Sequence, residues 1–297
     1  MQIRNTKNRR RKPRLADPLH RLTLRWRQGG VEEYPLSEHG EPHRRALRRI
    51  GSEFEITEPR IRLAALPDAF RGFRIVQLTD IHHGVFLPGE MLRHVVALVN
   101  TLEPDLIALT GDFITYSRAY IEPVAEILGG LRSKHGTFAA LGNHDFRVGA
   151  DEVAGALAAA GIDVLRNAHT RLRRRGQSLY IAGIDDLYYR ADLDRAMRGV
   201  PRGASSILLS HNPGIIRAAA RAGVPLVLSG HTHGGQVNIP FLGNIWGRSP
   251  EQLQFKVGWG RLGNTQIYVS RGIGTIVLPV RYRCPAEIPH LALDAVA

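Results

Sequence analysis

The sequence predicts an α/β fold in which helices pack on mixed β-sheets. From residue 73 to residue 229, apolar runs typical of strands alternate with segments whose apolar residues recur at the helical period. After residue 233 the pattern is mostly that of strands. Alternation followed by a run of strands is the order expected for an α/β sandwich with mixed sheets. The hydrophobic fraction of 43% in 297 residues supplies enough apolar surface for a sizeable core.

The first half of the regular region contains the clearest elements. Residues 73–78 form an apolar run typical of a buried strand. Residues 88–102 predict a helix with four apolar side chains on one face, Leu92, Val95, Val96 and Val99. The next expected elements are a strand at 105–109, a helix at 122–131, a strand at 137–141 and a helix at 151–160.

The second half is expected to contain shorter elements. Strands are predicted near residue 165 and at 171–175, 178–182, 207–210 and 225–229, with a helix at 213–222. Beyond residue 233 we expect strands at 235–239, 252–257, 265–270 and 288–293. The sequence shows no internal repeat.

The first 52 residues are predicted to form an arm, separate from a domain at residues 53–297. Residues 1–15 are basic and are expected to be unstructured. Leu19, Leu22 and Trp26 follow a helical spacing, which predicts a short basic amphipathic helix at 18–27. Such a helix is typical of an interfacial membrane anchor, although packing on the domain fits the pattern equally well. Residues 28–52 are charged and turn-rich, which indicates a linker.

The arm carries most of the excess positive charge. Residues 1–27 contain ten Lys or Arg and one acid, a net of 10 − 1 = +9 out of +13, which leaves +4 for the rest of the chain. A basic arm is suited to an anionic surface, either an acidic lipid leaflet or nucleic acid, and a solvated arm is the alternative. The domain has no basic stripe interleaved with aromatic residues, which disfavours nucleic acid. We therefore expect residues 1–27 to contact an anionic membrane surface.

The sequence also bounds the compartment and the chemistry. It contains no run of about 20 apolar residues that would span a membrane, and no apolar signal-peptide segment follows the basic start. We expect a cytoplasmic protein that is at most peripheral on the inner leaflet. Cys284 is the only cysteine, which excludes an internal disulfide and a thiolate-rich metal site. The oligomeric state stays open.

Five polar clusters follow apolar strands. They are Thr79-Asp80-Ile81-His82, Thr110-Gly111-Asp112, Gly142-Asn143-His144-Asp145, Ser210-His211-Asn212 and Ser229-Gly230-His231-Thr232-His233-Gly234-Gly235. Loops at the carboxyl ends of strands in an open α/β sheet converge on one crevice, so these clusters are expected to meet. The glycines among them let the backbone turn sharply and approach a bound ion closely.

Together the clusters supply a mixed set of oxygen and imidazole ligands. The candidates are Asp80, His82, Asp112, Asn143, His211, His231 and His233. Such a set suits Mn, Fe, Zn, Ni or Co, among which we favour Mn. Seven side chains are too many for one catalytic ion and suit two divalent ions that share a bridging carboxylate. A pair of ions about 4 Å apart is a standard device for phosphate ester hydrolysis by a bridging water.

The order of the clusters resembles the signature of the calcineurin-like metallophosphoesterases. Residues 229–236, Ser-Gly-His-Thr-His-Gly-Gly-Gln, and residues 269–274, Val-Ser-Arg-Gly-Ile-Gly, narrow the resemblance. They are similar to a bacterial subfamily that includes cell-wall-associated phosphoesterases and UDP-2,3-diacylglucosamine pyrophosphatase. The resemblance covers roughly residues 70–293 and implies a four-layer α/β/β/α sandwich with two mixed β-sheets.

The resemblance also implies a role for each site residue. Asp80, His82 and His233 would hold the first metal ion, Asn143, His211 and His231 the second, and Asp112 would bridge the two. His144 would bind no metal and would instead stabilise charge on the phosphate or protonate the leaving oxygen. Relatives often carry an acid three residues after the bridging Asp, where this chain has Thr115. Asp145 and Asp185 are the two candidates that could substitute for that carboxylate, and the sequence does not decide whether either does so.

Apolar loops hint at the substrate. Residues 85–87 follow the first metal loop, and Ile239, Phe241, Leu242, Ile245 and Trp246 follow the last. Together with the basic arm they favour a lipid-linked nucleotide such as UDP-2,3-diacylglucosamine, although packing beneath the loops would also explain them. Arg271, with Arg281 and Arg283 nearby, is a candidate for contact with a pyrophosphate.

Two other functions stay open at this point. A broad-specificity phosphodiesterase or nuclease would use the same metal centre. A non-catalytic metal-binding scaffold would keep the fold but would be free to lose the ligands, and all seven are present together with His144. The intact ligand set therefore favours an enzyme.

Overall fold

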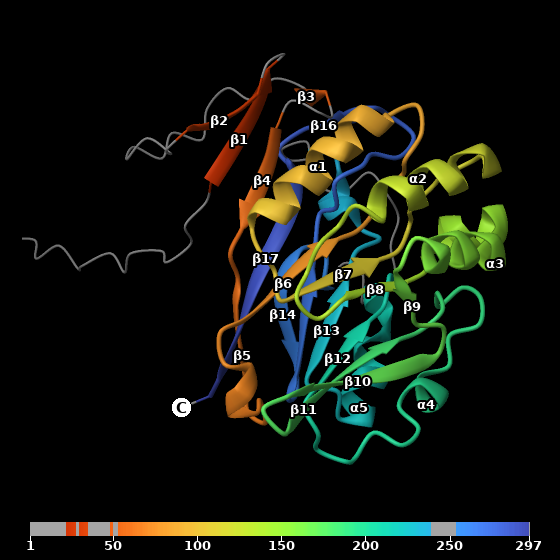
Figure 1. Ribbon diagram of the computed structural model, residues 1–297. Coiled ribbons are helices and arrows are strands. Elements are labelled where there is room, and N and C mark those ends of the chain that lie inside the picture. Colours follow the sequence, from red (N-terminus) through yellow and green to blue (C-terminus); the bar gives the residue numbers. More distant parts are fainter. Residues whose placement is uncertain (1–21, 28–29, 35–47, 50–52, 239–253, 297) are drawn as a thin grey trace, which may run out of the picture.

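Within the described residues, a pair of β-sheets packed face to face carries the fold, and helices cover the outer faces (Figure 1). The computed structural model describes residues 22–27, 30–34, 48–49, 53–238 and 254–296. The first sheet has the order β2-β1-β4-β17-β6-β7-β8-β9, and β5 also pairs with β17. Its strands are β1 (Leu22–Arg27), β2 (Gly30–Tyr34), β4 (Glu53–Thr57), β5 (Arg60–Leu63), β6 (Phe73–Leu78), β7 (Leu106–Thr110), β8 (Thr137–Ala140), β9 (Asp163–Val164) and β17 (Ala286–Ala295).

The second sheet has the order β10-β11-β12-β13-β15-β14. Its strands are β10 (Ala168–Arg174), β11 (Gln177–Gly183), β12 (Ser206–Leu209), β13 (Leu226–Ser229), β14 (Gly258–Leu262) and β15 (Thr265–Val269). Both sheets are mixed: β6 to β9 and β11 to β13 run parallel, whereas β17 is antiparallel to β6 and β10 is antiparallel to β11. A short ladder joins β16 (Val280–Arg281) to β3 (Arg48–Arg49).

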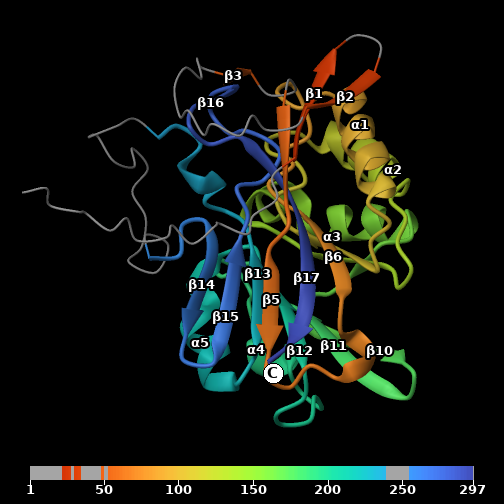
Figure 2. The same ribbon diagram turned by 90° about the vertical axis from the view of Figure 1, so that its left-hand side faces the viewer.

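Alternation along the strands produces the layers. On β7, Leu106 and Ala108 join the cluster between the sheets, while Ile107 and Leu109 join the cluster beneath the helices on the other face. In the second sheet, Leu208 of β12 packs instead into a third cluster with the helices of the opposite side. Figure 2 shows α1, α2 and α3 on one side of the paired sheets and α5 on the other. This arrangement confirms the predicted α/β/β/α order.

The helices pack by their apolar faces. They are α1 (Gly89–Thr101), α2 (Ile121–Leu128), α3 (Asn143–Ala159), α4 (Leu193–Ala196) and α5 (Ile216–Ala222). In α1 the buried residues are the four that the sequence places on one face, Leu92, Val95, Val96 and Val99. In the part of the chain that the structure describes, no helix has the length and apolar character needed to cross a membrane.

The predicted helix at 18–27 is wrong where the structure describes it. Leu22–Arg27 is the strand β1, which pairs antiparallel with both β2 and β4. The segment Leu-Thr-Leu-Arg-Trp-Arg also alternates apolar and polar residues, which is the strand period. In so short a segment both periods fit, and pairing with β4 decides between them. The predicted linker likewise contains β2 and β3, while residues 1–15 and the proposed boundary residues 50–52 lie outside the described chain.

Three further expectations need correction. The helix expected at 151–160 begins earlier, at Asn143, and Gly149 with φ 152° interrupts it. In place of the strand expected at 235–239, a 3₁₀ turn, η4 (His233–Gly235), is followed by a single bridge at Val237, and Ile239 is not described. The strand expected at 252–257 is absent from the described residues 254–257, and β14 starts at Gly258. Phe255 is buried in the third cluster instead of standing in a ladder.

Candidate metal centre

The predicted ligands come together at the carboxyl ends of five strands. Loops after β6, β7 and β8 of the first sheet meet loops after β12 and β13 of the second. Gln77 joins the two sheets beneath this point, because its amide donates to the Thr110 hydroxyl and to the Ser229 carbonyl oxygen, both at 2.9 Å. Both bonds are buried, so the seam between the sheets is fixed directly under the site.

The first group consists of Asp80, His82 and His233, all buried. The Nε2 atoms of His82 and His233 lie 3.1 Å apart, and His233 Nε2 is 3.1 Å from Asp80 Oδ1. Ligand atoms that share one ion are separated by about 3 Å, because each lies about 2 Å from the metal. The donor atoms of this group therefore have the type and spacing that a divalent ion requires.

The second group centres on Asp112 and His211, with Asp80 also within reach. His211 Nε2 is 3.1 Å from Asp112 Oδ2 and 3.2 Å from Nδ1 of His231. Asp112 Oδ2 is also 3.5 Å from His82 Nε2, which places this carboxylate between the two groups. Within the described residues, the buried Oδ1 of Asn143 has no hydrogen-bond partner, as expected for an atom reserved for a cation. The residues present therefore fit a pair of divalent ions.

Hydrogen bonds orient two of the imidazoles. Nδ1 of His211 donates to the Thr110 carbonyl oxygen at 2.8 Å, because a carbonyl oxygen only accepts, and this leaves Nε2 facing Asp112. Nδ1 of His82 lies 2.7 Å from the Thr115 hydroxyl. Thr115 thus contacts a predicted ligand from the position where relatives often carry an acid. Such contacts set the tautomer and the direction of a metal-binding histidine.

Asp145 and Asp185, the two candidates to replace the acid at position 115, contact groups other than the predicted ligand side chains. Asp145 accepts backbone N–H bonds from Asp112, Phe113 and Gly142 at 2.8–2.9 Å, so it ties the second and third loops together. Asp185 forms an ion pair with Arg166 at 3.0 Å. Asp145 therefore organises the loop backbone around the site, and Thr115 is the group that reaches a ligand side chain.

The charges of the buried groups fit cation binding. Burial alone would raise the pKa of Asp80. Neighbouring histidines, above all His233, lower the pKa by more than burial raises it, so it lies below its ordinary value. Burial lowers the pKa of His82 to about 3, against the opposing charge of Asp112. For His211, the Asp112 carboxylate outweighs burial and raises the pKa well above its usual value. The pKa of Asp112 is lowered as well, chiefly by His211, so both carboxylates favour positive charge at this point. An ion that binds beside His211 would take the place of the proton that Asp112 favours there.

The loops are held in an uncommon backbone conformation. Asp80, His82, Asp112, His231 and His233 all have positive φ angles, between 49° and 69°. Non-glycine residues rarely adopt this region, and clusters of them mark functional sites, at about 1–3 kcal/mol each. Gly142 and Gly230 contribute close approach rather than unusual φ, because a Cβ at Gly230 would collide with Asp80 Oδ2 and one at Gly142 with Asp112 Oδ1.

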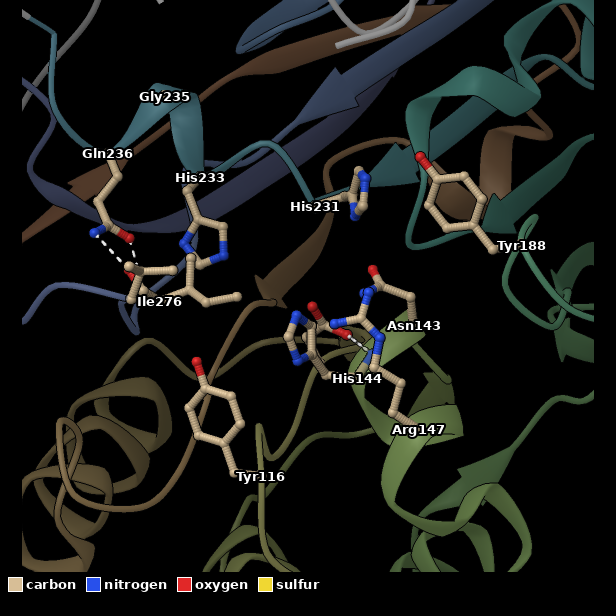
Figure 3. Close-up of a pocket in the computed structure, with 12 residues that line it drawn as sticks. Tyr116, Asn143, His144, Arg147, Tyr188, His231, His233, Gly235, Gln236 and Ile276 are labelled. Atoms are coloured by element: carbon tan, nitrogen blue, oxygen red, sulfur yellow. Dashed lines mark hydrogen bonds between the residues drawn. The ribbon is translucent and has the colours of Figure 1, made fainter. Parts of the chain in front are cut away.

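An open pocket of about 540 Å³, the metal-centre pocket, lies over these groups (Figure 3). Its lining residues are Asp112, Tyr116, Asn143, His144, Arg147, Tyr188, His231, His233, Gly235, Gln236, Ile276 and Val277. The backbone N–H of His144 donates to Asp112 Oδ1 at 2.9 Å, and its Nδ1 donates to the Thr115 carbonyl oxygen at 3.4 Å. Nε2 of His144 is thereby left for the pocket. Burial lowers the pKa of His144, and the charge of Asp112 opposes that shift.

Arg271 lies elsewhere. Its guanidinium pairs with Glu55 at 2.7 Å and Glu287 at 3.1 Å, and the residue lines a separate cavity of about 380 Å³, the rear cavity. Arg283 lines the same rear cavity. Arg281 is buried and donates to backbone carbonyl oxygens, among them that of Gly272 at 3.0 Å. The prediction that Arg271 binds substrate therefore has no support from the geometry.

Sequence reasoning missed Arg147, Tyr116 and Tyr188, which line the metal-centre pocket. Arg147 lies three residues after His144, close to one helical turn, and α3 begins at Asn143. Had the helix been expected to begin at Asn143 rather than at 151, this spacing would have placed Arg147 beside His144. The two tyrosines carried no comparable signal, because only the packing of the sheets brings their loops together.

Comparison with known proteins agrees with the geometry. The family described as calcineurin-like phosphoesterase matches residues 73–235, a range that contains every predicted ligand and His144. The uncharacterized metallophosphoesterase YkuE of Bacillus subtilis is 35% identical over 246 residues, covering 81% of this chain and 86% of that protein. Phosphodiesterase YaeI of Escherichia coli is 30% identical, with 79% and 87% covered. A transmembrane protein with metallophosphoesterase domain of Danio rerio is 32% identical, and this chain spans 57% of its length.

Proposed function

Because the chain belongs to the calcineurin-like phosphoesterase family, we propose that it hydrolyses phosphodiester or pyrophosphate bonds at a centre of two divalent ions. It is a metal-dependent phosphoesterase of the hydrolase class. The observation that carries the proposal is the position of Asp112, whose Oδ2 lies 3.5 Å from His82 in one group and 3.1 Å from His211 in the other. A carboxylate in this position is suited to be shared by a pair of ions.

The proposed ligand roles follow the two groups. Asp80, His82 and His233 would hold one ion, Asn143, His211 and His231 the other, and Asp112 both. When bound, such ions polarise the phosphoryl oxygens and lower the pKa of a water molecule, and we favour Mn for both positions. His144 would face the substrate through Nε2, where it can stabilise charge or give a proton to the leaving oxygen.

A lipid-linked nucleotide such as UDP-2,3-diacylglucosamine is the substrate that we favour. Val85 is 82% exposed beside the first metal loop, and Val277 and Leu278 are each 51% exposed at or next to the metal-centre pocket. Exposed aliphatic side chains around a phosphoesterase centre suit an acyl chain. Leu87 is fully buried and belongs to the core, and residues 239–246 lie outside the described residues.

The basic arm is proposed to bring the enzyme to an anionic membrane surface, on the cytoplasmic side. Residues 1–15 contain seven Lys or Arg and no acid. Because Leu22–Arg27 pairs with β4, a deletion that tests the arm should spare β1. Removal of residues 1–15 should weaken sedimentation with phosphatidylserine vesicles and leave hydrolysis of a soluble diester unchanged. Equal sedimentation of both proteins would contradict the membrane contact.

The function itself is tested by metal removal and reconstitution. Chelated protein should not hydrolyse bis-p-nitrophenyl phosphate, and added Mn should restore turnover. A protein that binds Mn tightly and still releases no nitrophenol would be a scaffold rather than an enzyme. Turnover of single-stranded DNA in preference to lipid nucleotides would replace the favoured substrate with the nuclease alternative and leave the metal centre intact.

A further inference from the structure

Among the residues that the structure describes, no acidic side chain neutralises the arginine in the metal-centre pocket. Arg147 lines the pocket and is exposed. In the described part of the chain it forms no ion pair, whereas Arg118, Arg166 and Arg271 each hold a carboxylate. It lines the same wall of α3 as Asn143 and His144. An unneutralised guanidinium beside a phosphoesterase centre offers a planar set of donors to an anion.

Two tyrosines flank this position on opposite walls. Tyr116 comes from the loop after β7 in the first sheet, and its ring lies 6.5 Å from that of His144. Tyr188 comes from the loop after β11 in the second sheet, and its ring lies 5.9 Å from that of His231. Figure 3 shows the two rings on opposite sides of Asn143 and His144, with Arg147 between them.

The tyrosines are unusually exposed for their size. Tyr116 is 73% exposed and Tyr188 is 63% exposed, so each presents an apolar face to the pocket mouth. Flat exposed rings are suited to stack on sugars or bases of a ligand. A substrate with organic groups on both sides of its phosphate would meet one such ring at each end.

We propose that Arg147 is the residue that binds the second phosphoryl group of a pyrophosphate substrate and so distinguishes pyrophosphates from simple diesters. The inference rests on the proposed function and adds the residue that selects pyrophosphates over simple diesters. A phosphodiester places its one phosphoryl group at the ligands around Asp112 and leaves Arg147 without an anion. A pyrophosphate fills both positions within the same 540 Å³ pocket.

Hydrolysis of such a pyrophosphate gives two phosphate monoesters. The oxygen of water bonds to one phosphorus, and the bond from that phosphorus to the bridging oxygen breaks. The bridging oxygen keeps the electron pair and leaves as part of the second phosphate. One proton of water stays on the first phosphate, and the other reaches the leaving oxygen through His144. Arg147 stabilises the charge that this second phosphate gains.

The test compares two soluble substrates in the Mn-loaded protein. UDP-glucose carries two phosphoryl groups, and the p-nitrophenyl ester of thymidine 5′-phosphate carries one. For Arg147→Gln we expect kcat/KM toward UDP-glucose to fall about 10–100-fold more than kcat/KM toward the ester, with Arg147→Lys intermediate. Arg173→Gln, at an exposed position of β10 outside the pocket, is the control for the loss of one surface charge. Tyr116→Leu and Tyr188→Leu should each cost roughly tenfold on UDP-glucose.

The outcomes separate this inference from the function on which it rests. If the wild-type protein hydrolyses the ester but not UDP-glucose, the pyrophosphate inference is overturned and the phosphoesterase function stands. If Arg147→Gln lowers both activities equally, Arg147 does not bind a second phosphate. If the wild-type protein hydrolyses neither substrate with Mn present, the proposed function itself fails.

Discussion

Two cavities share the turn that carries His231 and His233, and they hold their arginines in opposite ways. The metal-centre pocket includes His231, His233 and Gly235, and its Arg147 pairs with no carboxylate in the described chain. The rear cavity includes Gly234 of the same turn, and its Arg271 is fixed between Glu55 and Glu287. Both cavities contain an arginine side chain, but only in the metal-centre pocket is the charge of the guanidinium available to a ligand. An arginine in a cavity therefore indicates a binding site only when its own chain leaves it unneutralised.

The contrast between the two cavities requires that the metal-centre pocket is catalytic. Substitution of Asp112 should therefore give the largest loss of turnover. Asp112→Asn keeps the size of the side chain and removes the charge that lies within 3.5 Å of His82 and 3.1 Å of His211. Turnover of bis-p-nitrophenyl phosphate should fall to the background rate. Wild-type turnover in this variant would contradict the shared-ligand assignment.

His144 should give the next largest effect. His144→Ala removes a ring that faces the pocket but belongs to neither ligand group. We expect kcat to fall about 10²–10⁴-fold while the metal content stays unchanged. If the variant loses metal in plasma emission analysis, His144 is a ligand rather than a catalytic residue.

On the other side of the turn, Arg271 should affect stability rather than substrate binding. Arg271→Met leaves Glu55 and Glu287 without their buried partner. The free energy of unfolding should fall by about 3 kcal/mol, with a drop in Tm of roughly 10 °C by calorimetry. A variant that keeps its Tm but shows a raised KM would instead support Arg271 as a substrate-binding residue.

Thr115 should give the smallest effect on the metal side. Thr115→Val preserves the shape of the side chain and removes the hydroxyl that lies 2.7 Å from His82 Nδ1. Affinity for Mn or kcat should decrease about 10–100-fold, as is usual when the partner of a metal-binding histidine is lost. Titration of the chelated protein with Mn measures the change, and Thr115→Ser, which keeps a hydroxyl, should restore most of it.

The sequence predicted the surroundings of the metal-centre pocket far better than those of the rear cavity. Each polar cluster directly follows an apolar strand, and the carboxyl ends of parallel strands lie at one edge, so local pattern and topology together were sufficient to predict that the clusters converge. The strand Phe73–Leu78 has the predicted bounds, and α1 buries the predicted face. The ion pair that holds Arg271 could not be predicted, because its partner Glu55 lies 216 positions away and nothing in the sequence links the two.

The remaining errors have the same physical origin. Leu22–Arg27 satisfies both the helical and the strand period, and only its pairing with β4 makes it a strand. Tyr116 and Tyr188 lie in loops that follow strands of different sheets, so their common pocket depends on how the sheets pack. Local pattern predicts elements and strand-end clusters, whereas neutralised charges and shared cavities depend on contacts between distant parts of the chain.

The most direct test of the account is the number of metal ions per chain. Purified protein that has been chelated and then dialysed against Mn should contain two ions per chain by plasma emission analysis, held by the two buried groups. Asp112→Asn should hold fewer than two under the same conditions. One ion in the wild-type protein, or two in the variant, would contradict a centre in which Asp112 is the shared ligand.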